Sequence, residues 1–313
     1  MSNYVATIDL GTNTFHLLIA EIQPNRDFHL IYRERIPVMI GRGSINQGFI
    51  TPEAEERALA ALTHFRSKLT SYQVPSERVR CTATSAFRNA NNGQELADKI
   101  KRTTGITVDI IPGDQEAEYI YYGVRHAISL STENSLIMDI GGGSVEFILC
   151  NQDQVFWKQS FEIGAQRLLD RFDIQDPITD SNVDALQNYF SETLVSLATA
   201  VEQYQPETLI GASGTFDTLS EIYQHRSNTE VKESAPELPL TPDAFKQMLQ
   251  DFSQMNRAQR LEIPGMIEMR VDMIVPASWL VQFVLETYQI HSIRISSYAL
   301  KEGLVTQLAK RFS

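Results

Sequence analysis

The sequence predicts an α/β protein made of two duplicated domains with a cleft between them, and three observations support this. The chain has 313 residues, which is too long for one small core. The order of predicted strands and helices in the first half begins again near residue 134. A turn that contains glycine follows the first strand of each half, at residues 9–14 and 139–144. A duplicated α/β pair of this kind typically binds its ligand between the domains.

The first half opens with three predicted strands, at 4–9, 15–22 and 28–36, separated by a Gly/Thr/Asn turn and a Pro/Asn turn. A helix follows, because Thr51 before Pro52 is typical of an N-cap with a first-position proline. Its apolar residues recur at helical spacing: Ala54, Ala58, Leu62, Phe65 and Leu69. The remaining predicted elements are a strand at 79–84, a helix at 93–103, a strand at 107–111 and a helix that starts near Asp114.

The second half repeats this order. Its predicted elements are strands at 135–140, 145–150 and 155–163, helical patterns over 164–204, and a strand at 208–212. They continue with a polar surface loop at 225–242, an apolar helix at 271–285 with a proline near its start, a strand at 291–296 and an amphipathic helix at 299–312. We expect domain boundaries of 1–124 and 125–298, with the C-terminal helix 299–313 packed on the first domain and the crossing near 123–133.

Composition and charge exclude several classes of protein. Apolar residues make up 42% and charged residues 21%, which is typical of a globular chain. The net charge of -12 argues against a nucleic-acid or anionic-membrane partner. No apolar run reaches the roughly 18–20 residues that a membrane helix needs, and no leader is recognisable, so we expect a cytoplasmic protein. Cys81 and Cys150 lie in apolar strands and are interpreted as packed thiols, and the apolar helix 271–285 is compatible with a homodimer.

The first turn has the residue types of a phosphate-binding hairpin. Asp9 ends a strand, and the small residues Gly11, Thr12, Asn13 and Thr14 precede the next one. Backbone N–H groups in such a turn can surround a phosphate. The alternative is an ordinary hairpin turn with no ligand.

The second turn contains three consecutive glycines, Gly141, Gly142 and Gly143. Consecutive glycines cost backbone entropy, and a close approach of the backbone to an anion is one reason to keep them. Asp139 can hold Mg²⁺, directly or through water, and Ser144 and Glu146 add a donor and a second carboxylate. A glycine-rich hairpin without a ligand is the alternative.

These turns resemble the two phosphate loops of the exopolyphosphatase and guanosine pentaphosphate phosphohydrolase family, a phosphatase branch of the actin, sugar kinase and Hsp70 superfamily. Other segments resemble the family in order and spacing: 83–88 (Ala-Thr-Ser-Ala-Phe-Arg), 111–118 (Ile-Pro-Gly-Asp-Gln-Glu-Ala-Glu), 211–215 (Gly-Ala-Ser-Gly-Thr) and 301–304 (Lys-Glu-Gly-Leu). The resemblance covers nearly the whole chain and implies two actin-like (ribonuclease H-like) domains. Long members add a C-terminal helical region, so we expect the short two-domain form.

The resemblance also implies roles for individual residues. It makes Glu116 the general base that activates water, although acids at 114, 116 and 118 also suit the first turn of a helix. It makes Arg88 a phosphate-binding guanidinium, although most arginines are surface residues. Ser213, Gly214 and Thr215 bind phosphate at a helix N-terminus or form an ordinary capping turn. Arg270 is a weaker phosphate candidate, Asp272 is structural, and Asp139, Glu146 and Asp9 are the expected ligands of Mg²⁺ or another divalent cation.

We therefore expect an enzyme that uses water activated by Glu116 to release the terminal orthophosphate of inorganic polyphosphate, of guanosine pentaphosphate, or of both. His16 is expected to have a packing role, and no nucleophile signature supports a covalent mechanism. Two alternatives remain open. One is an ATP-dependent kinase of the sugar or acetate type, and the other is an alarmone-binding or actin-like assembly protein that does not hydrolyse its ligand.

Overall fold

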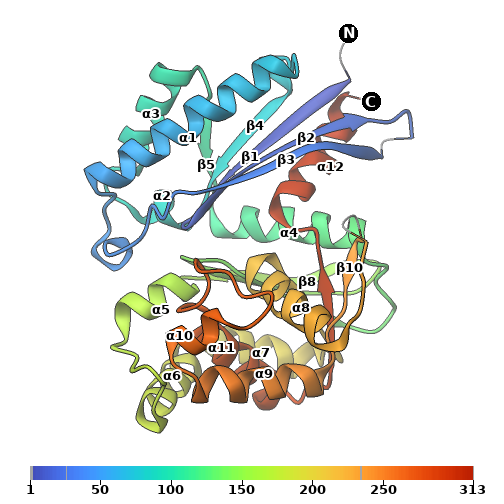
Figure 1. Ribbon diagram of the computed structural model, residues 1–313. Helices are drawn as coiled ribbons and strands as arrows, with labels where there is room; N and C mark the ends of the chain where they lie inside the picture. The colour runs from blue at the N-terminus through green and yellow to red at the C-terminus, as the bar shows by residue number, and fades with distance from the viewer. Residues whose placement is uncertain (1–2, 26, 233–234, 313) are drawn as a thin grey trace. The chain divides into compact units, whose positions relative to one another are not determined.

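The computed structural model describes residues 3–25, 27–232 and 235–312 (Figure 1). Its internal contacts divide the chain into two compact units. Unit 1 comprises Met1–His126 and Ala299–Ser313, and unit 2 comprises Ala127–Tyr298. The sequence prediction placed its boundaries at 124/125 and 298/299.

Unit 1 is a five-stranded sheet with helices on both faces. The strand order is β3-β2-β1-β4-β5, in which β1 pairs antiparallel with β2 and parallel with β4. The strands are β1 (Tyr4–Leu10), β2 (Thr14–Ile22), β3 (Phe28–Pro37), β4 (Val79–Ala83) and β5 (Val108–Ile110). The helices are α1 (Pro52–Ser71), α2 (Ser85–Asn89), α3 (Gly93–Thr104), α4 (Gly113–Ala127) and α12 (Leu300–Phe312), with short 3-10 turns at Ile45–Gln47 and Ser76–Arg78.

The predicted cap, proline and apolar stripe of helix α1 are all present in the structure. The Thr51 side chain accepts a hydrogen bond from the Ala54 N–H, and Pro52 occupies the first helical position. The expected apolar stripe from Ala54 to Leu69 is buried, and it packs in the core of unit 1. The prediction for this helix is confirmed.

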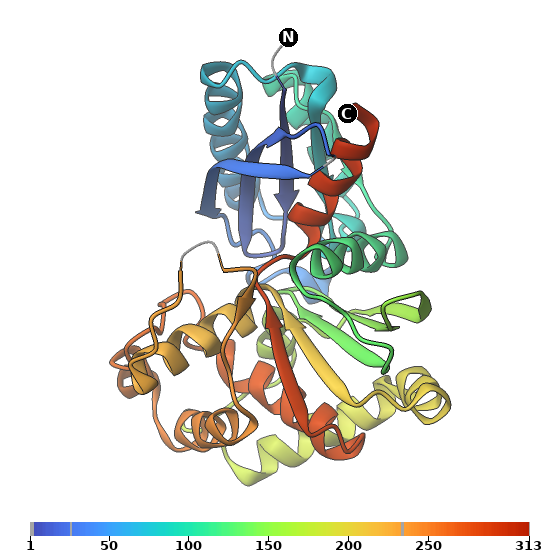
Figure 2. The same ribbon diagram turned by 90° about the vertical axis from the view of Figure 1, so that its right-hand side faces the viewer.

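The last helix, α12, lies across the other face of the unit 1 sheet, against β1, β2 and β3 (Figure 2). At the start of α12, the Glu302 side chain accepts a hydrogen bond from the Ala299 N–H at 2.9 Å. Gly303 lets α12 approach α4 closely, because a Cβ at Gly303 would lie 1.8 Å from the Tyr119 carbonyl oxygen. The Lys-Glu-Gly-Leu segment therefore has a structural role in joining the end of the chain to unit 1.

Unit 2 repeats the same five-strand pattern and adds one short edge strand. Its order is β10-β11-β9-β6-β7-β8, where β6 pairs antiparallel with β7 and parallel with β9. The strands are β6 (Ser135–Ile140), β7 (Val145–Cys150), β8 (Val155–Phe161), β9 (Thr208–Ala212), β10 (Glu237–Leu238) and β11 (Ser292–Ser296). The predicted duplication is thus visible in the topology of the two sheets.

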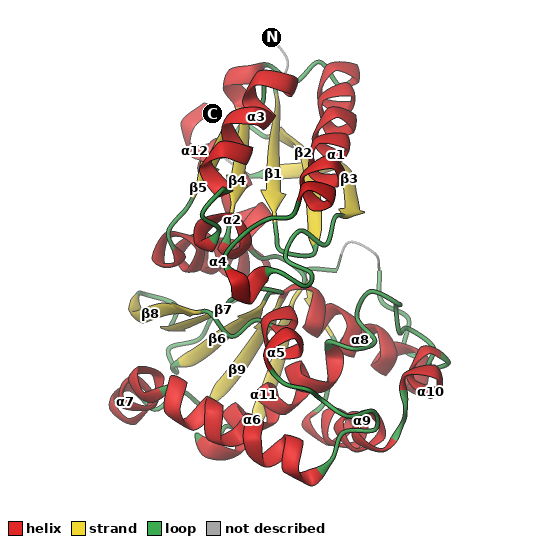
Figure 3. Ribbon diagram, turned by 90° about the vertical axis from the view of Figure 1, so that its left-hand side faces the viewer, coloured by secondary structure: helices red, strands yellow, loops and turns green. Residues whose placement is uncertain are grey.

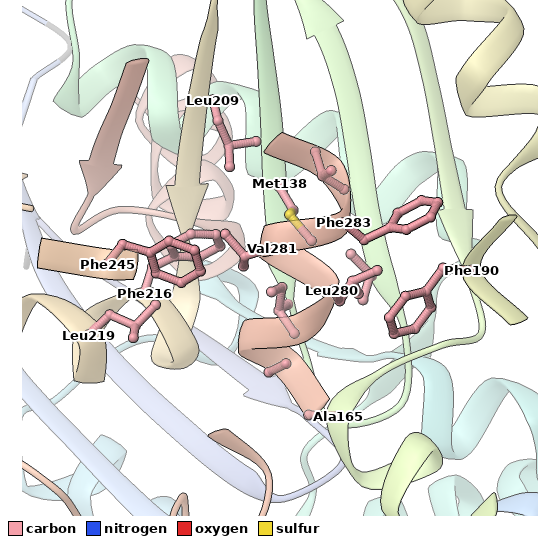
Figure 4. Packing of buried hydrophobic residues seen from close by; sticks show 14 of the residues in the cluster. Met138, Ala165, Phe190, Leu209, Phe216, Leu219, Phe245, Leu280, Val281 and Phe283 are labelled. Atoms are coloured by element: carbon pink, nitrogen blue, oxygen red, sulfur yellow. The ribbon is translucent and has the colours of Figure 1, made fainter. Parts of the chain in front are cut away.

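The helices of unit 2 surround one large apolar core (Figure 3). They are α5 (Ala165–Arg171), α6 (Asp180–Thr193), α7 (Val195–Tyr204), α8 (Ser213–Ser227), α9 (Pro242–Gln254), α10 (Arg257–Leu261) and α11 (Ile274–Thr287). Figure 4 shows Leu280, Val281 and Phe283 of α11 among Phe216, Phe245 and Phe190 from neighbouring elements. Because α11 is internal, this core explains its apolar sequence, and α11 gives no support for a homodimer.

Three sequence predictions need correction. The expected loop 225–242 contains the end of α8 and the strand β10, which pairs with β11; residues 233 and 234 of that loop lie outside the described part. The apolar helix begins at Ile274 rather than at 271, because Arg260 binds the Val271 carbonyl and holds the preceding turn. The turn expected before Arg88 is the short helix α2.

The interpretation of the two cysteines as packed thiols is confirmed. Cys81 and Cys150 are both buried free thiols, and burial, with the nearby charges of Asp9 and Asp109, raises the pKa of Cys81 well above its ordinary value. Within the described residues, no helix combines the length and apolarity that crossing a bilayer would require.

The close packing at Gly303 gives a test of the fold. We expect Gly303→Ala to lower the free energy of unfolding by about 1–3 kcal/mol, because the new methyl group forces α12 away from α4. Chemical denaturation measures the change. Arg311→Ala, on the exposed end of the same helix, should change stability by less than about 0.5 kcal/mol. Equal stability of the two variants would contradict the packing argument.

Candidate active site

The two predicted loops occupy equivalent positions in the two units. Residues 11–14 connect the paired residues Leu10 and Phe15, and residues 141–144 connect Ile140 and Val145. A Cβ at Gly11 would lie 3.0 Å from the Thr14 carbonyl oxygen, and one at Gly141 would lie 3.1 Å from that of Ser144. Both turns therefore fold back tightly on themselves at their first residue, which explains the shared glycine.

Two buried acidic residues lie on neighbouring strands beside the glycine turn of unit 2. Asp139 on β6 is directly opposite Glu146 on β7, and the two residues are only 4% and 1% exposed. The Ser213 hydroxyl donates to Asp139 Oδ2 at 2.7 Å, and the Ser160 hydroxyl donates to Glu146 Oε1 at 2.6 Å. Each acid is thus fixed in orientation by a serine from a different element.

This donor set fits a hard divalent cation. Like charges directly opposite each other in a sheet are destabilising, and burying them raises the cost. A cation bound by carboxylate oxygens removes that cost, and Mg²⁺ commonly uses one or two carboxylates and keeps several waters. In the part of the chain that the structure describes, no group of three or more His, Cys, Asp or Glu side chains is placed to hold a metal ion. Asp9, the third expected ligand, lies on β1 of unit 1, opposite His16 and Thr82.

The segment 213–215 lies where β9 ends and α8 begins, as the sequence predicts. Ser213 has a φ of 68°, a left-handed conformation that is uncommon for a residue other than glycine. A Cβ at Gly214 would lie 2.0 Å from Nη2 of Arg270, so the guanidinium of Arg270 rests against the Gly214 backbone. Thr215 is buried. The structure therefore joins Asp139, Ser213, Gly214 and Arg270 into one continuous group within unit 2.

Asp272, by contrast, belongs to a separate ion-pair network. It lies 3.3 Å from Arg257 Nε and 4.0 Å from Arg260 Nη2, and Arg260 also binds Asp176 at 2.7 Å. These arginines hold the segment before α11. The structural role expected of Asp272 agrees with these contacts.

Glu116 and Arg88 form an ion pair within unit 1. Glu116 lies in the first turn of α4 and is 6% exposed, and its Oε2 accepts from Arg88 Nη1 at 2.9 Å. The same nitrogen of Arg88 donates to the Ile111 carbonyl at 3.1 Å, so it joins the carboxylate to the segment that precedes α4. Both are predicted site residues, and their contact with each other is a finding of the structure.

The carbonyl groups of the unit 1 turn are bound by the segment after β3. The Asn13 carbonyl accepts from the Val38 and Met39 N–H groups at 2.9 and 2.8 Å, and the Thr12 carbonyl accepts from Gly41 at 3.3 Å. Thr12, Asn13 and Thr14 are all buried.

The unit 2 turn is bound in the same way by residues 164–167, which we call the capping segment. The Gly143 carbonyl accepts from Gly164 N–H at 3.2 Å, and the Gly141 carbonyl accepts from Ala165 at 3.0 Å. The Gly142 carbonyl accepts from Gln166 at 2.9 Å and from Arg167 at 3.1 Å. All three glycine carbonyls of the turn are therefore bound by one short stretch of backbone.

The comparisons with known proteins identify the family. A model described as the Ppx/GppA phosphatase family matches residues 18–312. The chain belongs to this family. The guanosine-5'-triphosphate,3'-diphosphate pyrophosphatase of Photobacterium profundum is 30% identical over 99% of the chain, and the chain spans 60% of the length of that relative.

Solved structures of the Ppx/GppA family agree with this assignment. A crystal structure of an exopolyphosphatase from Cytophaga hutchinsonii is 44% identical, with a TM-score of 0.94 and 98% of each chain covered. The PPX-GPPA enzyme of Aquifex aeolicus, at 24% identity, has a TM-score of 0.78 with 97% of this chain and 99% of that chain covered, and it supports the fold alone. The strand order shared by units 1 and 2 is that of the actin-like, ribonuclease H-like fold of this family.

Sequence analysis of this Ppx/GppA member missed Ser160 and the capping segment. Ser160 lies in an ordinary strand pattern, and only the pairing of β7 with β8 shows that it faces Glu146. Gly164 carried a usable signal, since it is a glycine between the third strand of the second repeat and a helix. In the first repeat Gly41 likewise follows the third strand, so an alignment of the two halves beyond that strand would have drawn attention to both.

The strain that we assign to the Ser213 backbone can be tested by comparing the stabilities of two variants. Ser213→Gly and Ser213→Ala both remove the hydroxyl bond to Asp139, so they differ mainly in backbone preference. We expect the glycine variant to be more stable by about 1 kcal/mol in denaturant unfolding, because only glycine adopts a φ of 68° without strain. At Ser191, exposed within α6, the order should reverse by a similar amount. An alanine variant as stable as the glycine variant at 213 would refute the assignment of strain.

Proposed function

We propose that this protein hydrolyses the terminal phosphoanhydride bond of inorganic polyphosphate and releases orthophosphate. The observation that carries the proposal is the buried Asp139–Glu146 pair beside the glycine turn. A cation site next to a set of backbone amides suits a substrate whose charge is concentrated on terminal phosphate oxygens. The 44% identical relative that is named an exopolyphosphatase supports polyphosphate as the substrate.

Each unit contributes a set of groups to the proposed reaction. In unit 1, Glu116 activates water, while Arg88 and the turn residues Gly11, Thr12, Asn13 and Thr14 bind phosphate. In unit 2, the phosphate-binding groups are Gly141, Gly142, Gly143, Ser144, Ser213, Gly214, Thr215 and Arg270. Asp139 and Glu146 are the proposed ligands of Mg²⁺ in unit 2, and Asp9 is the proposed ligand in unit 1. When bound, the ion would neutralise charge on the phosphate oxygens.

The contact with Arg88 supports a proposed role for Glu116 in orienting water. A carboxylate in an ion pair is held at a fixed position, and it accepts a hydrogen bond from water without leaving that position. Phosphoryl transfer needs an aligned nucleophile more than a strong base, because its transition state has little bonding to the incoming oxygen. Orientation of the water by Glu116 is therefore sufficient for the proposed role.

Guanosine pentaphosphate is the second candidate substrate, because the 30% identical relative carries the name of an enzyme that acts on it. Purified protein with Mg²⁺ should be given polyphosphate or guanosine pentaphosphate, and released orthophosphate measured for each. A kinase would instead require ATP and transfer its phosphate to an acceptor. A non-hydrolytic binding protein would release no phosphate from either substrate, and that result would refute the proposal.

Replacement of Glu116 tests the proposed catalytic role. We expect Glu116→Gln to lower kcat by about 10²–10⁴-fold, because the amide is a poorer acceptor for the water proton. Orthophosphate release under saturating polyphosphate measures the change. Glu118→Gln is the matched control on the same helix, where the carboxylate accepts from Tyr122, and it should retain activity within a few-fold. Circular dichroism should confirm that both variants are folded.

Because of the Asp139–Glu146 pair, we expect Mg²⁺ to stabilise the folded protein. For the unsubstituted protein, Mg²⁺ at about 100 times its dissociation constant should add about 2.7 kcal/mol. The Glu146→Gln variant should lose most of this gain. Without metal, its midpoint of thermal unfolding should be on the order of 2 °C higher than that of the unsubstituted protein, because the opposed charges are gone. Differential scanning fluorimetry with and without MgCl₂ measures both effects, with exposed Glu202→Gln as the control. An undiminished response in Glu146→Gln would exclude Glu146 as a ligand.

A further inference from the structure

The capping segment determines which way the amides of the glycine turn point. A trans peptide group is planar, and its C=O and N–H point in opposite directions. The carbonyls of Gly141, Gly142 and Gly143 point toward residues 164–167, to which they are hydrogen-bonded. The N–H groups in those same peptides belong to Gly142, Gly143 and Ser144. These three consecutive donors therefore point away from the capping segment, and together we call them the amide cradle.

The capping segment lies too close to the turn for an ordinary residue at its start. A Cβ at Gly164 would lie 2.5 Å from the carbonyl carbon and oxygen of Gly142 and from the carbonyl carbon of Gly143. Real Cβ atoms do not approach backbone this closely, so a side chain at 164 would displace the turn. Gly164 is thus required for contact between the two segments.

Arg167 adds its side chain to this arrangement. Its Nε donates to the Gly143 carbonyl at 3.0 Å, while its own N–H donates to Gly142. Its Nη2 donates to Glu162 at 2.9 Å, and the side chain is only 12% exposed. The Gly143 carbonyl thus accepts from a charged guanidinium as well as from Gly164. A charged donor on the oxygen polarises the peptide and strengthens its N–H, which is the donor of Ser144.

Unit 1 contains a corresponding arrangement, which argues against an accidental contact. There the N–H groups of Val38, Met39 and Gly41 bind the turn carbonyls, and a helix supplies an arginine. Arg57 of α1 donates from Nε to the Val38 carbonyl at 2.7 Å and from Nη2 to the Met39 carbonyl at 3.1 Å. In both repeats, therefore, the segment after the third strand binds the turn and an arginine stabilises the contact.

We propose that Arg167 is a positioning residue that orients and polarises the amide cradle for a terminal phosphate. The inference rests on the proposed function in assigning phosphate to the cradle, while the orientation of the amides follows from the hydrogen bonds themselves. Arg167 acts through the Gly143–Ser144 peptide and does not itself contact the substrate. Its guanidinium has Glu162 as a charge partner, which is consistent with a supporting role.

The test measures binding of inorganic phosphate directly. Backbone amide signals of Gly142, Gly143 and Ser144, followed by ¹⁵N NMR during a phosphate titration with Mg²⁺ present, should shift in the unsubstituted protein. In Arg167→Leu the phosphate affinity should fall by about 10–100-fold, the usual effect of losing a supporting group. Arg167→Lys should recover part of the loss, because the ammonium can donate one hydrogen bond to Gly143. The KM for polyphosphate should rise in parallel with the loss of phosphate affinity.

The same helix supplies the controls. Arg171→Leu removes an exposed arginine of α5 that lies over the Tyr189 ring, and Gln166→Ala keeps the backbone N–H that binds Gly142. Both should bind phosphate as the unsubstituted protein does. Equal phosphate affinity in Arg167→Leu and the unsubstituted protein would overturn the positioning role and leave the proposed function intact. Absence of any shift in the cradle amides of an active, unsubstituted enzyme would overturn the cradle itself.

Discussion

The carbonyl groups of Gly141, Gly142 and Gly143 are all bound by one short segment, and the orientation of the turn in unit 2 follows from this constraint. Because C=O and N–H are antiparallel within a peptide, each hydrogen bond to a turn carbonyl also fixes the direction of an amide donor. Four backbone N–H groups from residues 164–167 supply these bonds. The capping segment needs Gly164 for its close approach to the turn, because a Cβ there would lie 2.5 Å from the backbone of Gly142 and Gly143. The proposed phosphate site, if made of these amides, depends on this second segment, which a search for glycine-rich loops does not reveal.

Each of the two duplicated units contains a turn whose carbonyls are bound by a neighbouring segment, and the two units differ in the residue opposite the aspartate. Both turns begin with a glycine that lies against its own fourth residue, and both are followed by a strand residue directly opposite an aspartate. In unit 1 the partner of Asp9 is His16, a residue that does not add negative charge. In unit 2 the partner of Asp139 is Glu146, which places a second carboxyl group at the buried position. The fold therefore retains the same backbone arrangement in both units, while one residue change makes the second copy suited to a divalent cation.

Much of this fold could be predicted from the sequence, because its strands and helices are locally determined. The apolar stripe of α1 and its Thr-Pro start, the three opening strands of each half and the two turns need only nearby residues. The contacts that define the site could not be predicted in the same way. The pairs Arg88–Glu116, Ser160–Glu146 and Ser213–Asp139 join residues separated by 28, 14 and 74 positions. Such pairs depend on strand register and on where a helix begins after its strand, and neither is set by local pattern.

The ion pair of Glu116 also bears on the kind of catalysis that this fold can support. The Arg88–Glu116 ion pair holds the carboxylate of Glu116 at a fixed position, with Nη1 2.9 Å from Oε2. It is well suited to a reaction in which alignment of water and neutralisation of phosphate charge lower the barrier. The guanidinium of Arg88 fixes the position of Glu116, and for the proposed hydrolysis of a phosphoanhydride bond that fixed position is the property that matters.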